Sequence, residues 1–271
     1  MEKIKKALEK ASISRSNSRS NIPSQRNTFS ITPRNRVPDI TYTETSKLEL
    51  QIDHLRKNCI ITGEDNDPVT DAYKVLRTRI LQYMRENKCS SLAITSPTSG
   101  NGKTINAINL SISLSKDVNQ TVLLVDFDLR NPNIGKYLTT QTLPGLSDYL
   151  DGNKTISEIL FNPNIERLVV LPGNKPYTNS SEMLSSPKIQ DLVHELKNYY
   201  KSRIVIFDLP PVLPCDDALA FLPYVDSFML VVEDKKNKKE EIVRAHQLLD
   251  QDKFIGTVIN KSSEEVSLYS Y

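Results

Sequence analysis

The stretch that decides the fold is "SLAITSPTSGNGKT" (residues 91–104), in which a short apolar run leads directly into a turn with two glycines. Residues 91–96 have the length and composition of a buried strand. Gly100 and Gly102 can adopt backbone conformations that strain other residues, so the amides of the turn can point inward around phosphate oxygens. The stretch therefore predicts a strand followed by a phosphate-binding loop.

The residues after the glycines support this interpretation. Lys103 can reach the β and γ phosphates of a nucleotide, and the Thr104 hydroxyl can ligate magnesium at the start of the next helix. Pro97 stands where such loops usually have their first glycine, so a chance glycine turn is the alternative. The residues expected to hold the nucleotide here are Ser99, Gly100, Asn101, Gly102, Lys103 and Thr104.

Five further apolar runs of strand length follow the loop, at residues 121–128, 167–172, 203–210, 227–233 and 254–261. Helical patterns separate most of them, most clearly at residues 104–116, 187–200 and 239–250. Near-continuous apolar strands joined by helices predict an α/β fold, with a mostly parallel sheet covered on both faces. Ligands bind beyond the carboxyl ends of the strands in such sheets, so we expect the chemistry there.

Polar residues occupy three of those strand ends. Asp126 and Asp128 alternate along a strand, so both side chains are expected to point the same way, and a cation or proton must then separate their charges. With magnesium present, one of the pair could accept a proton from an incoming hydroxyl; a solvated strand end with a helix-capping aspartate is the alternative. Asp208 is expected to hold magnesium through water, and the Asn260 amide could pair with an adenine edge.

Composition limits the remaining possibilities. The 271 residues, 38% of them hydrophobic, suffice for one core with appendages, and no apolar run has the length of a membrane helix or the position of a secretory signal. Cys59, Cys89 and Cys215 lack metal-ligand spacing, so we expect buried or incidental thiols in a reducing cytoplasm.

The N-terminal region is strongly basic, with nine lysines or arginines against two glutamates in residues 1–36. Residues 1–11 predict a short amphipathic helix, which could dock to a partner or to anionic lipid; a frayed helix without a role is the alternative. Residues 12–45, rich in serine and arginine, predict a disordered linker before a folded domain at 46–263. No motif supports nucleic-acid binding, and none is expected.

The segments "TSPTSGNGKT", "LLVDFDLR" and "IVIFDLPP" together resemble the three nucleotide-binding motifs of bacterial tyrosine kinases, which share a three-layer P-loop NTPase fold with the MinD/ParA ATPases. "AYKVLRTRILQYMREN" and "NSSEMLSSPKIQDLV" resemble more narrowly the tyrosine autokinases of exopolysaccharide loci. The resemblance implies ATP and Mg²⁺ as cofactors, Asp126 as the base toward tyrosine, and Arg130 close to the phosphates. It implies catalytic roles for Lys103, Asp126 and Asp128, and metal binding by Thr104, Asp128 and Asp208.

The same resemblance gives the last residues a role. In this family, tyrosines on a flexible C-terminus are phosphorylated in a neighbouring subunit, so Tyr269 and Tyr271 of the tail at 264–271 are the expected acceptors. A frayed tail without a role is the alternative for these residues, and a nucleotide-dependent assembly switch of the MinD/ParA type, without kinase activity, is the alternative function.

The expected partners follow from the same source. They are further copies of the chain, for which Asp71, Lys74 and Arg77 occupy the positions of a subunit-contact motif, and a transmembrane chain-length-determinant protein as activator. The implied location is the cytoplasm, peripheral at the inner face of the membrane, and the implied output is control of exopolysaccharide chain length and export.

Overall fold

The computed structural model describes residues 45–62, 67–198 and 202–262. The chain divides into two units, 1–35 and 36–271, and every described residue belongs to the second. The predicted N-terminal helix, nearly all of the predicted linker and the predicted acceptor tail therefore lie outside the described residues.

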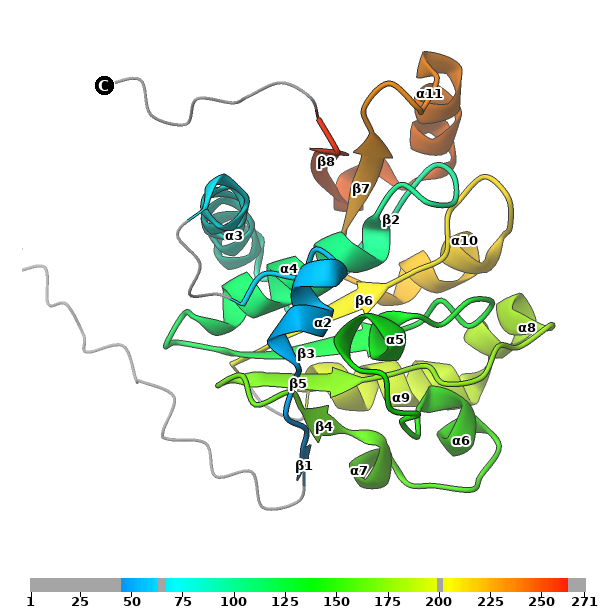
Figure 1. Ribbon diagram of the computed structural model, residues 1–271. Coiled ribbons are helices and arrows are strands. Elements are labelled where there is room, and N and C mark those ends of the chain that lie inside the picture. Colours follow the sequence, from blue (N-terminus) through cyan, green and yellow to red (C-terminus); the bar gives the residue numbers. More distant parts are fainter. Residues whose placement is uncertain (1–44, 63–66, 199–201, 263–271) are drawn as a thin grey trace, which may run out of the picture. The chain divides into compact units, whose positions relative to one another are not determined.

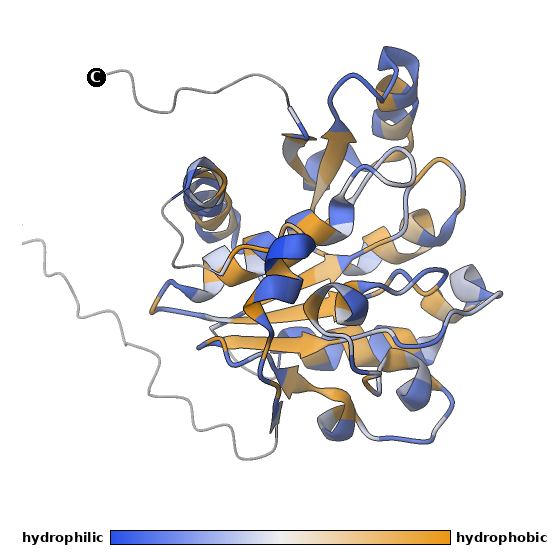
Figure 2. Ribbon diagram, in the orientation of Figure 1, coloured by the Kyte–Doolittle hydropathy of each residue, from blue (hydrophilic) through white to orange (hydrophobic). Residues whose placement is uncertain are grey.

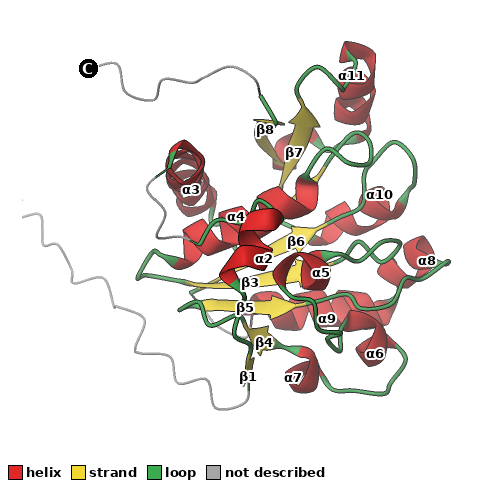
Figure 3. Cartoon of the chain, viewed as in Figure 1, coloured by secondary structure: helices red, strands yellow, loops and turns green. Residues whose placement is uncertain are grey.

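One mixed sheet of eight strands forms the centre of the described region (Figures 1 and 3). Its strands are β1 (Ser46–Lys47), β2 (Ser91–Thr95), β3 (Thr121–Asp126), β4 (Phe161–Asn162), β5 (Leu168–Leu171), β6 (Arg203–Asp208), β7 (Ser227–Glu233) and β8 (Phe254–Asn260). Their order is β1-β4-β5-β3-β6-β2-β7-β8, and every neighbouring pair is parallel except β4 and β5. This confirms the predicted mostly parallel sheet. The six predicted strands all form, whereas β1 and β4, with two residues each, are too short to leave a sequence pattern.

Helices cover both faces of this sheet. The helices are α2 (Ile52–Lys57), α3 (Pro68–Asn87), α4 (Lys103–Ser115), α5 (Ile134–Leu138), α6 (Leu146–Leu150), α7 (Ile156–Ile159), α8 (Ser180–Leu184), α9 (Pro187–Asn198), α10 (Asp217–Phe221) and α11 (Lys239–Leu248). Buried residues of α2 to α5 pack in one apolar cluster, and those of α6 to α11 pack in another. The described region is therefore a three-layer α/β domain, as the sequence predicts.

The central strands contribute buried side chains to both apolar clusters. Along β3, Leu123 and Val125 belong to the cluster under α6 to α11, whereas Val122 and Leu124 belong to the cluster under α2 to α5. Because successive side chains of a strand point to opposite faces, a strand buried on both sides must be apolar throughout. Figure 2 shows this as hydrophobic colour along the central strands.

Helix α3 carries the positions of the expected subunit-contact motif. Lys74 Nζ pairs with Asp71 Oδ1 at 2.8 Å within the helix, and Arg77 Nη1 donates to Ser113 O on α4 at 3.0 Å. All three side chains thus have partners in their own chain. The described residues contain no helix with the length and apolar character required to cross a membrane.

Candidate active site at the phosphate loop

The predicted loop joins β2 to α4, and we call residues 96–104 the phosphate loop. Gly100 and Gly102 have φ values of +80° and +90°, in the region that favours glycine. Gly102 is the N-cap of α4, so the loop ends where the first backbone amides of a 13-residue helix are free to bind an anion. The conformation inferred from the two glycines is therefore present.

Strand register brings the predicted acids beside this loop. Strand β6 lies between β3 and β2, so that Asp208 is aligned with Asp126 on one side and with Ile94 on the other. Asp208 thus ends the strand next to the one that leads into the phosphate loop. The carboxyl ends of β2, β3 and β6, which are far apart in the sequence, therefore lie side by side at one edge of the sheet. This is the arrangement expected for a ligand site.

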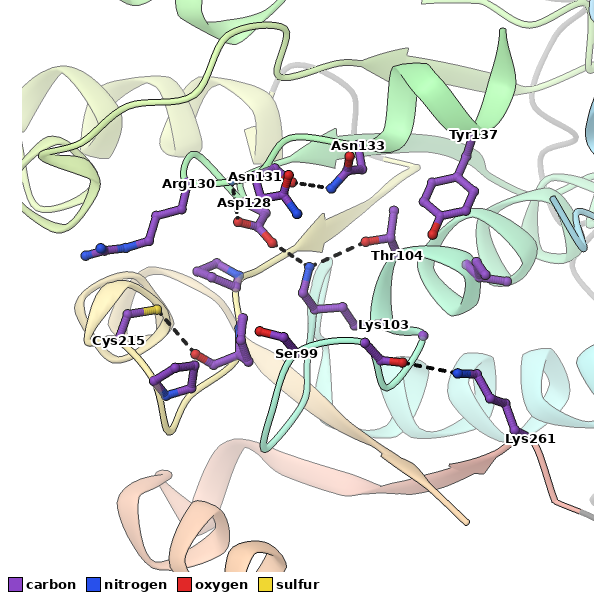
Figure 4. Close-up of a pocket in the computed structure, with 16 residues that line it drawn as sticks. Ser99, Lys103, Thr104, Asp128, Arg130, Asn131, Asn133, Tyr137, Cys215 and Lys261 are labelled. Atoms are coloured by element: carbon purple, nitrogen blue, oxygen red, sulfur yellow. Dashed lines mark hydrogen bonds and ion pairs between the residues drawn. The ribbon is translucent and has the colours of Figure 1, made fainter. Parts of the chain in front are cut away.

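Lys103 lies between two of these carboxylates. Its Nζ is 2.6 Å from Asp128 Oδ2, 3.7 Å from Asp208 Oδ1 and 3.4 Å from Thr104 Oγ1. Burial alone would lower the pKa of Lys103, but Asp208 and Asp128 outweigh it and raise the pKa above its ordinary value. The ammonium therefore stays charged at neutral pH and is the central cation of the site (Figure 4).

Asp126 is placed differently from Asp128. It is fully buried, does not line the cavity described below, and its Oδ2 accepts the backbone N–H groups of Asn133 and Ile134 at the start of α5, both at 2.9 Å. Burial, and then the charge of Asp208, raise its pKa well above the usual range. Asp126 thus has the helix-capping contacts that the sequence offered as the alternative to a catalytic role. Its role as base stays a prediction. Asp128 is the carboxylate that faces the cavity.

A cavity of about 370 Å³ opens at the phosphate loop. Its lining includes the predicted residues Ser99, Gly100, Gly102, Lys103, Thr104, Asp128 and Arg130. Asn131, Asn133, Tyr137, Pro210, Pro211, Cys215 and Lys261 also line it and had no predicted role. Most of these residues lie in the segments that follow the ends of β3, β6 and β8. The rule that ligands bind beyond strand ends points to these segments, but it does not say which of their side chains line the cavity.

Arg130 is held at the edge of this cavity by an acid that sequence reasoning did not find. Its Nε and Nη2 lie 2.9 Å and 2.8 Å from Asp217 Oδ1, and Asp217 is fully buried at the start of α10. In Figure 4 the guanidinium points away from Lys103. Arg130 thus lines the cavity, and its predicted contact with phosphate stays a prediction that requires the side chain to turn.

Asn260, predicted to read adenine, contacts the phosphate loop itself. Its Nδ2 donates to Asn101 O at 2.9 Å, so this N–H group is engaged with protein. The side chain of Asn101 is buried and accepts from Thr98 N and Thr98 Oγ1, so Asn101 supports the loop from within. The predicted acceptors Tyr269 and Tyr271 lie outside the described residues.

The donor set fits magnesium when a nucleotide supplies further oxygens. No three His, Cys, Asp or Glu side chains of the described residues are grouped so as to hold a metal by themselves. However, both carboxylate oxygens of Asp208 are buried without a hydrogen-bond partner, and the Thr104 hydroxyl lies near Lys103, which also contacts Asp208. Hydroxyl and carboxylate oxygens are hard ligands, which Mg²⁺ combines with phosphate oxygens and water.

Known proteins are similar to this chain in sequence and in fold. A family model described as an AAA domain matches residues 90–251. The tyrosine-protein kinase CpsD of Streptococcus agalactiae is 33% identical over 200 residues, which make up 73% of this chain and 84% of that protein. The chain belongs to the bacterial tyrosine kinases. This confirms the family suggested by the three motifs.

Solved structures place the kinase in the same group. The chimerical protein CapA2B2 is 26% identical with a TM-score of 0.70, covering 81% of this chain and 94% of that one. The kinase domain of the Escherichia coli tyrosine kinase ETK is 28% identical with a TM-score of 0.61, covering 74% of this chain and 80% of that one. The kinase therefore has the P-loop nucleotide-binding fold of its relatives.

Proposed function

We propose that the kinase uses ATP and Mg²⁺ to phosphorylate Tyr269 and Tyr271 of another copy of itself. The observation that carries this proposal is the position of Lys103, which joins a glycine-containing phosphate loop to the acids of two strand ends beside an open cavity. The two tyrosines are the acceptors that the resemblance to tyrosine autokinases implies.

Each residue of the site has a task in this reaction. The amides of the phosphate loop and Lys103 hold the phosphates, and Thr104 and Asp208 would hold Mg²⁺, which would neutralise charge on the transferred group. On nucleotide binding Lys103 exchanges Asp128 for phosphate. Asp128, which lines the cavity, then acts as the base in place of Asp126: it accepts the proton of the tyrosine hydroxyl as the tyrosine oxygen bonds to the γ-phosphorus and the bond to ADP breaks.

The test is phosphate transfer within the purified full-length kinase. Wild-type protein incubated with Mg-ATP is expected to gain phosphotyrosine, with mass spectrometry locating it at residues 269 and 271, and Tyr269→Phe/Tyr271→Phe removes it. In a mixture, Lys103→Met protein should be labelled by the Tyr269→Phe/Tyr271→Phe protein, because transfer is between copies. Phosphate release without phosphotyrosine supports the assembly switch instead.

The cellular role rests on the resemblance to autokinases of exopolysaccharide loci. We infer that phosphorylation controls exopolysaccharide chain length and export, and that a transmembrane chain-length-determinant protein recruits the kinase to the inner face of the membrane and activates it. A cytoplasmic peptide of such a protein, added to the kinase, is expected to raise the rate of tyrosine phosphorylation. An unchanged rate contradicts the activation.

A further inference from the structure

The phosphate loop is contacted by residues that are distant from it in the sequence. They come from the ends of β7, which lies next to β2 in the sheet, and of β8, the next strand beyond it, and from the turn after β7. We call these five residues the loop clamp: Glu233, Lys236, Asn237, Asn260 and Lys261. The reaction steps proposed above assign no task to any of them.

Asn260 holds the end of the phosphate loop. Besides the hydrogen bond to Asn101 O at 2.9 Å, its amide lies so close to Gly102 that a Cβ atom at Gly102 would collide with Asn260 Nδ2. The amide therefore packs directly on the glycine that caps α4. A side chain in place of this glycine would displace Asn260.

Two lysines hold the middle of the loop. Lys261 Nζ donates to Gly100 O at 3.2 Å, and the ammonium of Lys236 lies 3.0 Å from the place that a Cβ atom of Gly100 would take. Glu233 pairs with both, at 3.1 Å to Lys261 and 3.0 Å to Lys236. One carboxylate thus fixes two ammonium groups around Gly100, and Lys261 also lines the cavity.

Asn237 holds the start of the loop. Its Oδ1 accepts from Glu233 N at 2.8 Å, and its Nδ2 donates to Thr98 Oγ1 at 2.9 Å. Thr98 in turn donates to Asn101 Oδ1 from its backbone N–H. The clamp therefore contacts the loop at its start, its middle and its end, always through groups of the loop that do not need to face the phosphates.

We propose that the loop clamp consists of positioning residues, which hold the phosphate loop in its nucleotide-binding conformation before ATP arrives. A loop with two glycines has many conformations, and ordering it on binding would weaken affinity; a loop that is already ordered avoids this cost. The inference rests on the proposed use of ATP at this site. It also makes Lys261, three residues before the tail, a part of the nucleotide site.

The test compares two lysines on either side of β8. Lys253 Nζ donates to Pro223 O at 2.9 Å just before the strand and is a matched control, since it too binds a backbone carbonyl. Lys261→Met and Asn260→Asp are expected to raise the Kd for Mg-ATP and Mg-ADP about tenfold, as for one lost hydrogen bond to a charged or constrained group. Lys261→Arg keeps a donor and should stay within about threefold, and Lys253→Met should match wild type.

The kinetics separate positioning from a general loss of structure. The KM for ATP should rise in Lys261→Met while kcat at saturating ATP falls far less, because the clamp acts on binding. Unchanged affinity in both clamp variants overturns the proposal, as does a loss that Lys253→Met shares or that follows the melting temperature of the nucleotide-free proteins. Failure of wild-type protein to bind Mg-ATP would instead refute the proposed function.

Discussion

Lys103 Nζ lies 2.6 Å from Asp128 Oδ2, and this ion pair is almost closed to solvent, with 11% and 6% of the two side chains exposed. The lysine comes from the phosphate loop and the aspartate from the residues after β3, so the pair ties together two parts of the nucleotide site. A buried pair of this kind is costly to break on one side only, because the remaining charge has no partner.

Lys103→Met is expected to abolish ATP binding and to lower the free energy of unfolding by about 3 kcal/mol, because Asp128 and Asp208 lose their shared cation. The double variant Lys103→Met/Asp128→Asn should recover much of the stability but none of the ATP binding. Urea unfolding and calorimetric titration measure the two effects. Equal stability of the single and double variants would show that the pair does not hold the site together.

Asp126→Asn is expected to stabilise the nucleotide-free kinase near pH 7 to 8. Burial raises the pKa of Asp126 in the folded state, so the folded protein binds more protons than the unfolded chain, and stability falls as pH rises from the unfolded pKa of about 3.9 toward the folded one. The asparagine variant lacks this fall. At the upper end of this window the asparagine variant should be the more stable by about 1.4 kcal/mol or more.

Asp226→Asn is the matched control, because the pKa of Asp226 moves the other way. Burial opposes the shift, but hydrogen bonds from Lys197 and from the backbone of Ser90 lower the pKa, so this carboxylate stabilises the protein above its unfolded pKa. Asp226→Asn should therefore destabilise the protein at pH 7, with the difference vanishing as pH falls through the folded pKa. Unfolding curves between about pH 2 and 8 that show the same sign for both variants at neutral pH contradict this account.

Gly102→Ala is expected to damage the site more than Gly152→Ala does. Both glycines have positive φ, which costs an alanine roughly 1 kcal/mol, but a Cβ at Gly152 meets no atom within 4 Å, whereas one at Gly102 collides with Asn260. The collision adds about 1–3 kcal/mol and disturbs the loop, so ATP affinity should fall for Gly102→Ala alone. Thermal melting and nucleotide titration of the two variants decide; equal effects would contradict the close packing.

Asp217→Asn is expected to weaken the ion pair with Arg130 and so to lower the free energy of unfolding. Asp217 accepts both guanidinium bonds and is buried, whereas Asp216 is exposed and 3.9 Å away. Since the Arg130 side chain is 44% exposed, the loss should be moderate, about 1–2 kcal/mol for Asp217→Asn and under about 0.5 kcal/mol for Asp216→Asn. Chemical denaturation provides the measurement, and an Asp216→Asn effect as large as that of Asp217→Asn would refute the assignment.

The sequence by itself determined the elements of the fold and the chemistry of the loop. Apolar runs of strand length predict β2, β3 and β5 to β8, because a strand buried on both faces must be apolar along its whole length. The loop at residues 96–104 can equally be predicted from the sequence, because its glycines, lysine and threonine lie within a few residues of one another. Local conformation and local chemistry leave a pattern in the chain.

Tertiary structure decided how these parts are used. Asp126 and Asp128 are two residues apart, yet one caps α5 and the other faces the cavity with Lys103, because the chain leaves the strand between them. Asn260 reaches the phosphate loop, and Asp217 reaches Arg130, across 159 and 87 residues. Such contacts depend on strand order and on the packing of connecting segments, and these arise from interactions between residues that the sequence does not place side by side.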